Sequence, residues 1–367
     1  MKFTISREQV LPALQQIVSV IEKRQTMPIL SNVLVVLTKN KLVLTGTDLE
    51  IQIIAEIAIE SDIGMEFTIP ARKFLDICRL LPSGAEIRME HTDDAKIRII
   101  SGRSRFSLST LPAEDYPEFS ESEFEYRFSI NAGKLKKALD KTIFCMANQD
   151  VRYYLNGLML NISNSKIKLV ASDGHRLSVF EDGLESAAGY EARIIIPRKG
   201  VMELTRLLDD PDIEVEVRFS NNNIRIVIKD LTFSAKLVDA RYPDFNRVFQ
   251  QDFHNHILIQ RQLLKDALTR VAILSNEKFK GLSFDVSSES LKISTHNPEH
   301  EEAEEDLLIE YQGQPITIAF NAQYLLDAVS NLDSELAVIS IASNLSSCII
   351  DEPENQAYRF IVMPMRL

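Results

Sequence analysis

The sequence predicts an α+β protein made of three tandem repeats, each with two helices and antiparallel sheets. Three segments align without gaps: IPARKFLDICRLL from Ile69, IPRKGVMELTRLL from Ile196 and, more weakly, FNAQYLLDAVSNL from Phe320. Before each of them, an alternating strand leads through a polar turn into a returning strand. An amphipathic helix pattern opens each unit. Self-similarity at a period of about 125 residues indicates a repeat architecture.

The opening helix of each repeat is indicated by apolar residues at three- and four-residue spacing. Its predicted ranges are 7–24, 131–148 and 260–276. Ser6 and Asn131 are expected N-caps, because their side-chain oxygens can accept hydrogen bonds from free N–H groups of the first turn. The second helix is predicted over 71–81, 198–208 and 322–332.

The strands between the helices are expected to form hairpins. They begin at Lys41, Lys166 and Ser290 and turn at the dipeptides TD, SD and HN. Period-two alternation around a polar turn is a hairpin signal. The second copy contains VASDGHRLSV (170–179), whose acid, imidazole and guanidinium look like catalytic groups. Its place in the repeat favours a structural turn.

The repeats divide near two stretches, 118–126 and 247–256. The predicted domain limits are therefore 1–122, 128–247 and 253–367.

Composition indicates a folded protein of the cytoplasm. Of 367 residues, 45% are hydrophobic and 26% charged, which is the balance of a globular chain. No apolar run approaches the roughly 20 residues of a membrane span, and MKFTISREQV lacks the apolar core of a signal peptide. Cys78, Cys145 and Cys348 form no C-x-x-C pair. They are expected to be small buried side chains, with neither a disulfide framework nor a zinc ribbon.

Signatures of catalysis are weak. The chain has no G-x-x-x-x-G-K-[ST] loop, G-x-S-x-G elbow or H-E-x-x-H helix. His254 and His256 form an H-x-H without a nearby third ligand. His175 as a general base needs a nucleophile or an orienting acid, and Asp173 is expected to bond its own backbone in the turn. We predict no catalytic residue, metal or cofactor. An enzyme remains the second hypothesis, and a DNA-binding regulator or scaffold without a ring the third.

Charge is distributed unevenly between helices and the rest of the chain. The net charge is −12, yet the stretches 7–24, 71–81, 131–141, 198–208, 261–270 and 322–332 carry 16 basic and seven acidic side chains, so everything outside them carries −21. This bias predicts helices that share a surface facing a polyanion. Solvated helix faces are the alternative. Because no recognition-helix signature accompanies them, the contact is expected to be sequence-independent.

Geometry limits how such helices could surround DNA. Six helices about 10 Å across would line a ring with an opening of about 9 Å. Twelve would leave about 28 Å, wider than a duplex of roughly 20 Å. A head-to-tail dimer of this chain would therefore be needed to encircle duplex DNA.

Two oppositely charged segments are candidates for closing that dimer. SGRSRFSLS (101–109) carries Arg103 and Arg105, and HEEAEEDLLIE (300–310) carries a run of carboxylates. Opposite charges would set orientation, while apolar side chains supply contact area. The candidate interface residues are Arg103, Arg105, Phe106, Ile273, Leu274, Glu301 and Glu304. Two unrelated solvated charge runs are the alternative.

Long runs along the whole chain carry a family resemblance. They include LTGTDLE (44–50), IPARKFLDICRLLP (69–82), QDVRYYLNG (149–157), SDGHRL (172–177), NPEHEEAEE (297–305) and VMPMRL (362–367). The sequence resembles the beta sliding clamp family, the processivity subunit of bacterial DNA polymerase III. The resemblance implies half of a closed dimeric ring on duplex DNA, with no catalysis of its own. It also implies partners: the replicative polymerase, an ATP-dependent clamp loader, and other polymerases and repair proteins.

The resemblance also assigns residues to two sites. DNA contact is implied for Arg24, Lys73, Gln149, Tyr153 and Tyr154. Core packing is the alternative for both tyrosines, since DVRYYLNGL could also be a strand. A groove for partner peptides is implied for Leu155, Ser172, Gly174, His175, Arg176, Leu177, Pro243, Arg247, Val248, Asn321, Tyr324, Val362, Met363, Pro364, Met365 and Arg366. Ser172 departs from the family, which often has Thr there, so a modest change in affinity is expected.

Overall fold

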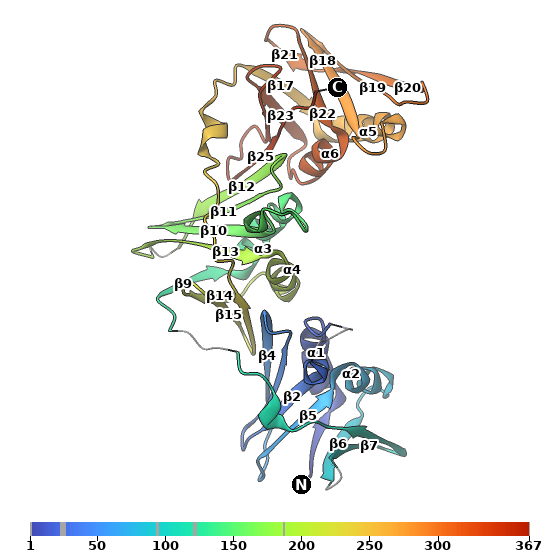
Figure 1. Ribbon diagram of the computed structural model, residues 1–367, viewed down its shortest axis with the longest axis vertical. Coiled ribbons are helices and arrows are strands. Elements are labelled where there is room, and N and C mark those ends of the chain that lie inside the picture. Colours follow the sequence, from blue (N-terminus) through green and yellow to red (C-terminus); the bar gives the residue numbers. More distant parts are fainter. Residues whose placement is uncertain (1, 23–26, 93–94, 120–122, 186–187, 367) are drawn as a thin grey trace. The chain divides into compact units, whose positions relative to one another are not determined.

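The computed structural model describes residues 2–22, 27–92, 95–119, 123–185 and 188–366. It divides into two compact units, residues 1–136 with 199–239 and residues 137–198 with 240–367. Both units combine helices with antiparallel sheets (Figure 1). The middle of the chain contributes strands to each of them. The predicted domain limits, 1–122, 128–247 and 253–367, stay a prediction.

Unit 1 contains an eight-stranded sheet in the order β5-β2-β3-β4-β16-β15-β14-β9 and a four-stranded sheet in the order β1-β6-β7-β8. Helices α1 (Arg7–Val18) and α2 (Ala71–Leu80) pack against each other. The strands are β1 Lys2–Ser6, β2 Asn32–Leu37, β3 Lys41–Thr47, β4 Ile51–Ala58, β5 Met65–Pro70, β6 Glu86–Thr92, β7 Lys96–Ser101, β8 Ser104–Ser109, β9 Tyr126–Asn131, β14 Glu214–Phe219, β15 Asn223–Ile228 and β16 Leu231–Lys236. Short 3-10 turns are η1 Pro28–Ser31 and η2 Ala113–Asp115.

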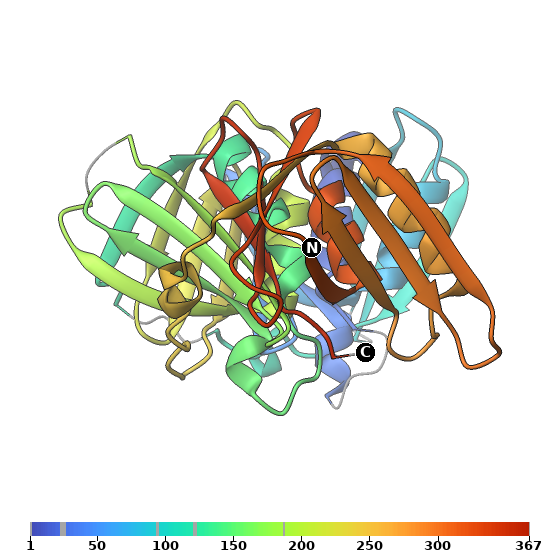
Figure 2. The ribbon, with the colours of Figure 1, turned by 90° about the horizontal axis from the view of Figure 1, so that it is seen from above.

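Unit 2 contains a nine-stranded sheet in the order β13-β10-β11-β12-β25-β24-β23-β17-β21 and a four-stranded sheet in the order β20-β19-β18-β22. Helices α5 (Arg261–Val271) and α6 (Ala322–Ser330) pack side by side, and Figure 2 shows α5 beside the orange strands of the smaller sheet. The strands are β10 Gly157–Ser163, β11 Lys166–Ser172, β12 Arg176–Gly183, β13 Glu191–Pro197, β17 Asn255–Gln260, β18 Gly281–Ser287, β19 Ser290–His296, β20 Glu302–Leu308, β21 Glu310–Tyr311, β22 Ile316–Asn321, β23 Leu336–Ile341, β24 Cys348–Asp351 and β25 Tyr358–Val362. The 3-10 turns are η3 Ile143–Cys145, η4 Tyr153–Leu155, η5 Asn246–Gln250 and η6 Ala272–Leu274. Helices α3 (Ala132–Asp140) and α4 (Arg198–Leu207) lie at the limits between the two units.

The strand orders reveal how repeats join. Each repeat forms two half-sheets of four strands, with β21 as a fifth strand in the third repeat's second half-sheet, and both sheet junctions follow one rule. The last strand of one repeat's first half-sheet pairs with the last strand of the next repeat's second half-sheet: β4 with β16, and β12 with β25. Among the described residues, the outer edges of β8 and β20 have no pairing strand.

The predicted hairpins are confirmed. Strands β3 and β4, β11 and β12, and β19 and β20 pair antiparallel around the expected turns. In the first turn, Asp48 Oδ1 accepts hydrogen bonds from the N–H groups of Glu50 and Ile51 at 2.9 and 2.7 Å. The caps are confirmed as well. Ser6 forms a reciprocal capping box with Gln9, and Asn131 Oδ1 accepts from Lys134 N at 3.0 Å.

The opening helices are shorter than predicted. Helix α1 ends at Val18 instead of residue 24, α3 ends at Asp140 instead of 148, and α5 ends at Val271 instead of 276. At α3, the Thr142 hydroxyl donates to Ala138 O at 2.8 Å and competes with the backbone ladder. Buried apolar residues such as Val20, Ile21 and Cys145 follow the helix ends. They continue the apolar spacing of the helices, so the sequence pattern predicted helices that are too long.

The three cysteines are buried free thiols, as predicted. Burial raises the pKa of Cys78 and of Cys348 to about 12, so neither thiol ionises readily. No helix in the described ranges is long and apolar enough to cross a membrane.

Replacing Asp351 with Asn should stabilise the fold at neutral pH. Burial raises the pKa of Asp351 to about 6, while Arg359 lowers it and Glu352 raises it. Since the folded pKa exceeds the unfolded one, ionisation costs stability above pH 6, and that cost disappears as pH falls toward 4. Allowing for solvent screening, Asp351→Asn should gain about 1 kcal/mol at pH 7.5 and nothing near pH 4.

Thermal unfolding midpoints at pH 4.5 and 7.5 measure this difference. The exposed Asp62 supplies the control variant, Asp62→Asn, which should leave both midpoints unchanged. An equal midpoint for Asp351→Asn and the parent chain at pH 7.5 would show that the burial cost is negligible.

Candidate functional site

A cavity of about 210 Å³ opens in unit 2 beside the β11–β12 turn. Its walls are mainly apolar and come from four separate segments of the chain. The lining residues are Arg152, Tyr154, Leu155, Ser172, Gly174, Arg176, Leu177, Tyr242, Pro243, Asp244, Phe245, Val248, Ile361 and Met363. An apolar cavity with a few polar groups at its edge suits a short peptide or a small ligand. We call it the groove.

The β11–β12 turn forms one edge of the groove. Asp173 Oδ1 accepts from His175 N at 2.9 Å and Arg176 N at 3.0 Å, so this carboxylate bonds its own backbone, as predicted. Ser172 Oγ accepts from Gly174 N at 3.0 Å and donates to Arg176 O at 2.7 Å. The polar groups of the turn are thereby engaged in holding its shape.

Gly174 suits its position for two reasons. Its φ is +88°, in the left-handed region. A Cβ there would lie 2.6 Å from Arg152 Nη1. Arg152 is itself held by Asp150, through Nε at 3.0 Å and Nη2 at 2.8 Å, and donates to Asp173 O at 3.0 Å. The hydrogen bonds from Arg152 lower the pKa of Asp150 to about 2, so the pair stays charged at neutral pH.

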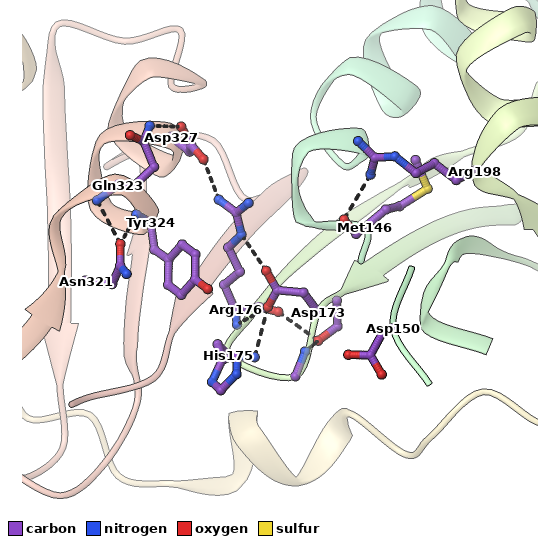
Figure 3. A network of polar contacts seen from close by, with 12 residues as sticks. Met146, Asp150, Asp173, His175, Arg176, Arg198, Asn321, Gln323, Tyr324 and Asp327 are labelled. Carbon is purple, nitrogen blue, oxygen red and sulfur yellow. Dashed lines mark hydrogen bonds and ion pairs between the residues drawn. The ribbon is translucent and has the colours of Figure 1, made fainter. Parts of the chain in front are cut away.

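Arg176 is pinned between two carboxylates from different elements (Figure 3). Its Nε donates to Asp173 Oδ2 at 3.0 Å, and its Nη1 pairs with Asp327 Oδ2 on α6. The guanidinium also lies 4.5 Å from the Tyr324 ring centroid. The His175 and Tyr324 rings stack at 6.4 Å with an interplanar angle of 21°. These contacts fix the turn on α6.

The C-terminal tail lies beside this turn and also lines the groove. Met363 N donates to His175 O at 2.9 Å, and Met365 N donates to Ala319 O at 2.7 Å. Because strand side chains alternate between faces, Ile361 and Met363 point the same way and line the groove. Val362 lies between them, 1% exposed, in the sheet interior.

The structure brings half of the predicted groove residues together. Leu155, Ser172, Gly174, Arg176, Leu177, Pro243, Val248 and Met363 line the cavity. His175 and Tyr324 stack beside it, and Asn321 caps α6 by accepting from Gln323 N and Tyr324 N. Met365 and Arg366 line a second cavity of about 670 Å³ with Phe279 and His296. Arg247, Val362 and Pro364 line neither cavity.

Some lining residues were not predicted for the groove: Arg152, Tyr154, Tyr242, Asp244, Phe245 and Ile361. Period-two alternation along the last strand could have selected Ile361 in place of Val362. The segment containing Tyr242 and Phe245 has no periodicity, so only its proximity to Pro243 pointed toward the groove.

Of the residues predicted to contact DNA, three are exposed, while Tyr154 is half-buried and lines the groove. Lys73 is exposed on α2, and Gln149 is exposed with a φ of +57°. Tyr153 is 58% exposed and packs edge-on against Tyr154, with centroids 6.0 Å apart. Core packing of Tyr153 is therefore wrong, and the pair lies in the 3-10 turn η4 instead of a strand. Arg24 lies outside the described residues.

The predicted dimer residues lie along the two open sheet edges or near them. Arg103 precedes β8, which carries Arg105 and the half-buried Phe106. Ile273 is 75% exposed in η6, next to Leu274. Glu301 precedes β20 and accepts from Asn297 Nδ2 at 2.7 Å, and Glu304 pairs with Lys292 at 2.5 Å.

Many basic side chains of the helices pair within the chain. Lys199 pairs with Glu22 and Asp48, Arg270 with Glu305, and Lys137 with Asp333 at 3.0 Å. The sequence-based charge count therefore overstates the positive charge available to a partner.

Comparison with known proteins covers the whole chain. Three family models match in order: the N-terminal domain of the DNA polymerase III beta subunit over residues 1–120, its central domain over 129–244 and its C-terminal domain over 246–366. The beta sliding clamp of Pseudomonas aeruginosa is 43% identical over 371 residues, and that of Escherichia coli K12 is 43% identical over 368. Both alignments cover 100% of each chain.

Solved structures agree. The crystal structure of a DnaN sliding clamp from P. aeruginosa bound to griselimycin matches with a TM-score of 0.97 at 42% identity. The Caulobacter crescentus pol III beta structure matches with a TM-score of 0.95 at 33% identity, and both matches cover 100% of each chain. These findings show a non-catalytic DNA sliding clamp that acts as processivity factor for DNA polymerase III. The chain belongs to the DNA polymerase III beta-subunit family.

Proposed function

We propose that two copies of this chain close head to tail into a ring around duplex DNA. The observation that carries the proposal is the open pair of sheet edges. Within the chain, β4 joins β16 and β12 joins β25 by one rule. Applied once more, the rule pairs β20 of the third repeat with β8 of a following first repeat. Since β8 is in the first repeat of the same sequence, that partner is a second copy.

Charge and exposure support this closure. An exposed strand edge with unpaired backbone groups is a template for another strand. Arg105 and its neighbour Arg103 make the β8 edge basic, while Glu302, Glu304 and Asp306 make β20 acidic. Leu308, 87% exposed on β20, and Ile273, 75% exposed, offer apolar area. Opposite charges on the two edges favour heterologous pairing over like-with-like pairing.

We also propose that the groove holds short peptides of the replicative polymerase, the clamp loader, and other polymerases and repair proteins. Its apolar walls and the flexible thioether of Met363 support binding of varied side chains. Lys73, Gln149 and Tyr153 are proposed to contact DNA, through phosphates or by stacking on unpaired bases. The ring is proposed to act in the cytoplasm, opened by an ATP-driven loader.

Retention on circular DNA tests the ring. After loading by the cognate ATP-dependent loader, the protein should stay on a closed circle and leave at least about tenfold faster once the circle is cut, because only topology holds it. Gel filtration of DNA-bound labelled protein, before and after linearisation, measures this. Equal loss from circles and linear DNA contradicts encirclement.

Charge reversal tests the head-to-tail interface. Arg103→Glu with Arg105→Glu should raise the dimer dissociation constant by more than about 100-fold, since like charges then face each other. Glu301→Lys with Glu304→Lys should do the same. Mixing the two double variants should restore a dimer, because both of its interfaces carry opposite charges. Sedimentation measures the masses. Failure of the mixture to dimerise would falsify head-to-tail pairing through these edges.

Truncation of Met363 tests the groove. Met363→Ala should weaken binding of polymerase peptides by about tenfold, since a well-packed methionine at the wall loses about 1 to 2 kcal/mol of contact. The chain contains no tryptophan, so a tryptophan-labelled peptide gives a fluorescence signal without background. Leu345→Ala removes a side chain 75% exposed outside the groove and should bind as the parent does. If Met363→Ala bound these peptides with unchanged affinity, the groove would not be their binding site.

A further inference from the structure

Arg176 has a different task from the one its place in the groove suggests. Its side chain is only 13% exposed, and its Nε and Nη1 are committed to Asp173 and Asp327. A guanidinium already neutralised by two carboxylates is a weak anchor for an anionic ligand. Its charge is used to fasten the β11–β12 turn to α6.

Asp327 is the half of this contact that lies outside the groove. Its side chain is 28% exposed, and it does not line the cavity. Its Oδ2 pairs with Arg176, and its Oδ1 accepts from Gln323 Nε2 at 2.8 Å. A side chain of the same helix therefore helps to orient the carboxylate toward the guanidinium (Figure 3).

Arg176 positions two segments that line the groove, the β11–β12 turn and the C-terminal tail. The backbone of Arg176 pairs with Val362 in the β12–β25 ladder, and His175 O accepts from Met363 N. Displacing the turn would therefore also move the tail that carries Ile361 and Met363. Gly174 in the turn and Leu177 in β12 also line the groove.

The first repeat fastens its equivalent turn to the next repeat's helix in a different way, because there Lys199 on α4 pairs with Asp48 of the turn. Its turn has the same Asx hydrogen bonds around Asp48, but Ile51 stands in the place of Arg176 and is 1% exposed. Glu203 on α4 occupies the position aligned with Asp327, and it accepts from Ser19 Oγ at 2.7 Å instead. Of the two junctions, the one with the groove, β12–β25, is where a helix carboxylate pairs with an arginine of the turn.

We propose that Asp327 is a positioning residue for the groove: through Arg176 it holds the Gly174–Leu177 edge in the peptide-competent arrangement. The inference rests on the proposed peptide function. Without the pair, the competent arrangement is a smaller fraction of the population, and apparent affinity falls by that fraction. A variant without the Asp327–Arg176 pair should therefore bind the peptide with a lower association rate. A variant that loses a direct contact with the peptide should instead have a higher dissociation rate.

The test uses the full-length chain and the tightest-binding segment from overlapping synthetic peptides of the cognate polymerase catalytic subunit. Asp327→Asn keeps the shape and removes the charge. It should lower the stopped-flow association rate about tenfold with the dissociation rate unchanged. Asp327→Glu, which keeps the carboxylate, should recover most of the rate. Glu203→Gln, the matched change on α4, should leave both rates at the parent values.

The outcomes separate this inference from the proposed function. If no polymerase segment binds the parent, or if Met363→Ala binds equally well, the peptide function fails. If the parent binds and Met363→Ala does not, but Asp327→Asn keeps the parent association rate, the positioning role is overturned and the groove stands. A raised dissociation rate in Asp327→Asn also overturns it.

Gln323→Ala covers the case in which Asp327→Asn does not fold. Gln323 is exposed, so its truncation leaves the core intact, yet it removes the hydrogen bond that orients Asp327. A loss in association rate of about twofold supports positioning. An unchanged rate overturns it.

Discussion

Continuous pairing of strand edges is the constraint on which the rest of this structure depends. A half-sheet of four strands has a terminal edge whose N–H and C=O groups need partners. In this chain, β4 and β16 satisfy each other, as do β12 and β25. The edges of β8 and β20 would satisfy each other in the same way in the proposed dimer. In that proposal, assembly repeats the contact that already joins the repeats of one chain.

The groove follows from where that pairing occurs. At the β12–β25 junction, the β11–β12 turn and the end of the chain come to lie side by side. The equivalent turn of the first repeat has the same hydrogen bonds, and Leu49 adopts a φ of +79° where Gly174 has +88°. A side chain at position 174 would collide with Arg152, whose Nη1 lies 2.6 Å from the place of a Cβ. Glycine therefore lets Arg152 lie against the β11–β12 turn at the junction that has the groove.

Patterns with a local physical cause were predictable from the sequence. Caps at Ser6 and Asn131, and hairpins around TD and SD, depend on groups within a few residues. Helix ends were not predictable, since Val20 and Ile21 are buried by tertiary packing that imitates the helical period. Within the groove, glycine and turn residues were found, but Tyr242 and Phe245 come from an irregular segment whose position only the fold determines.

The partners of charged side chains were the least predictable feature, because sequence shows charges without their contacts. Lys199 forms ion pairs with Glu22 and Asp48, and Arg270 forms one with Glu305. Each phosphate contact steepens the salt dependence of DNA affinity and slows movement along the duplex. A protein retained by topology gains nothing from tight phosphate binding. The basic side chains of the helices form ion pairs within a chain whose net charge is −12. Both features fit a ring that retains DNA by encircling it and binds its phosphates weakly.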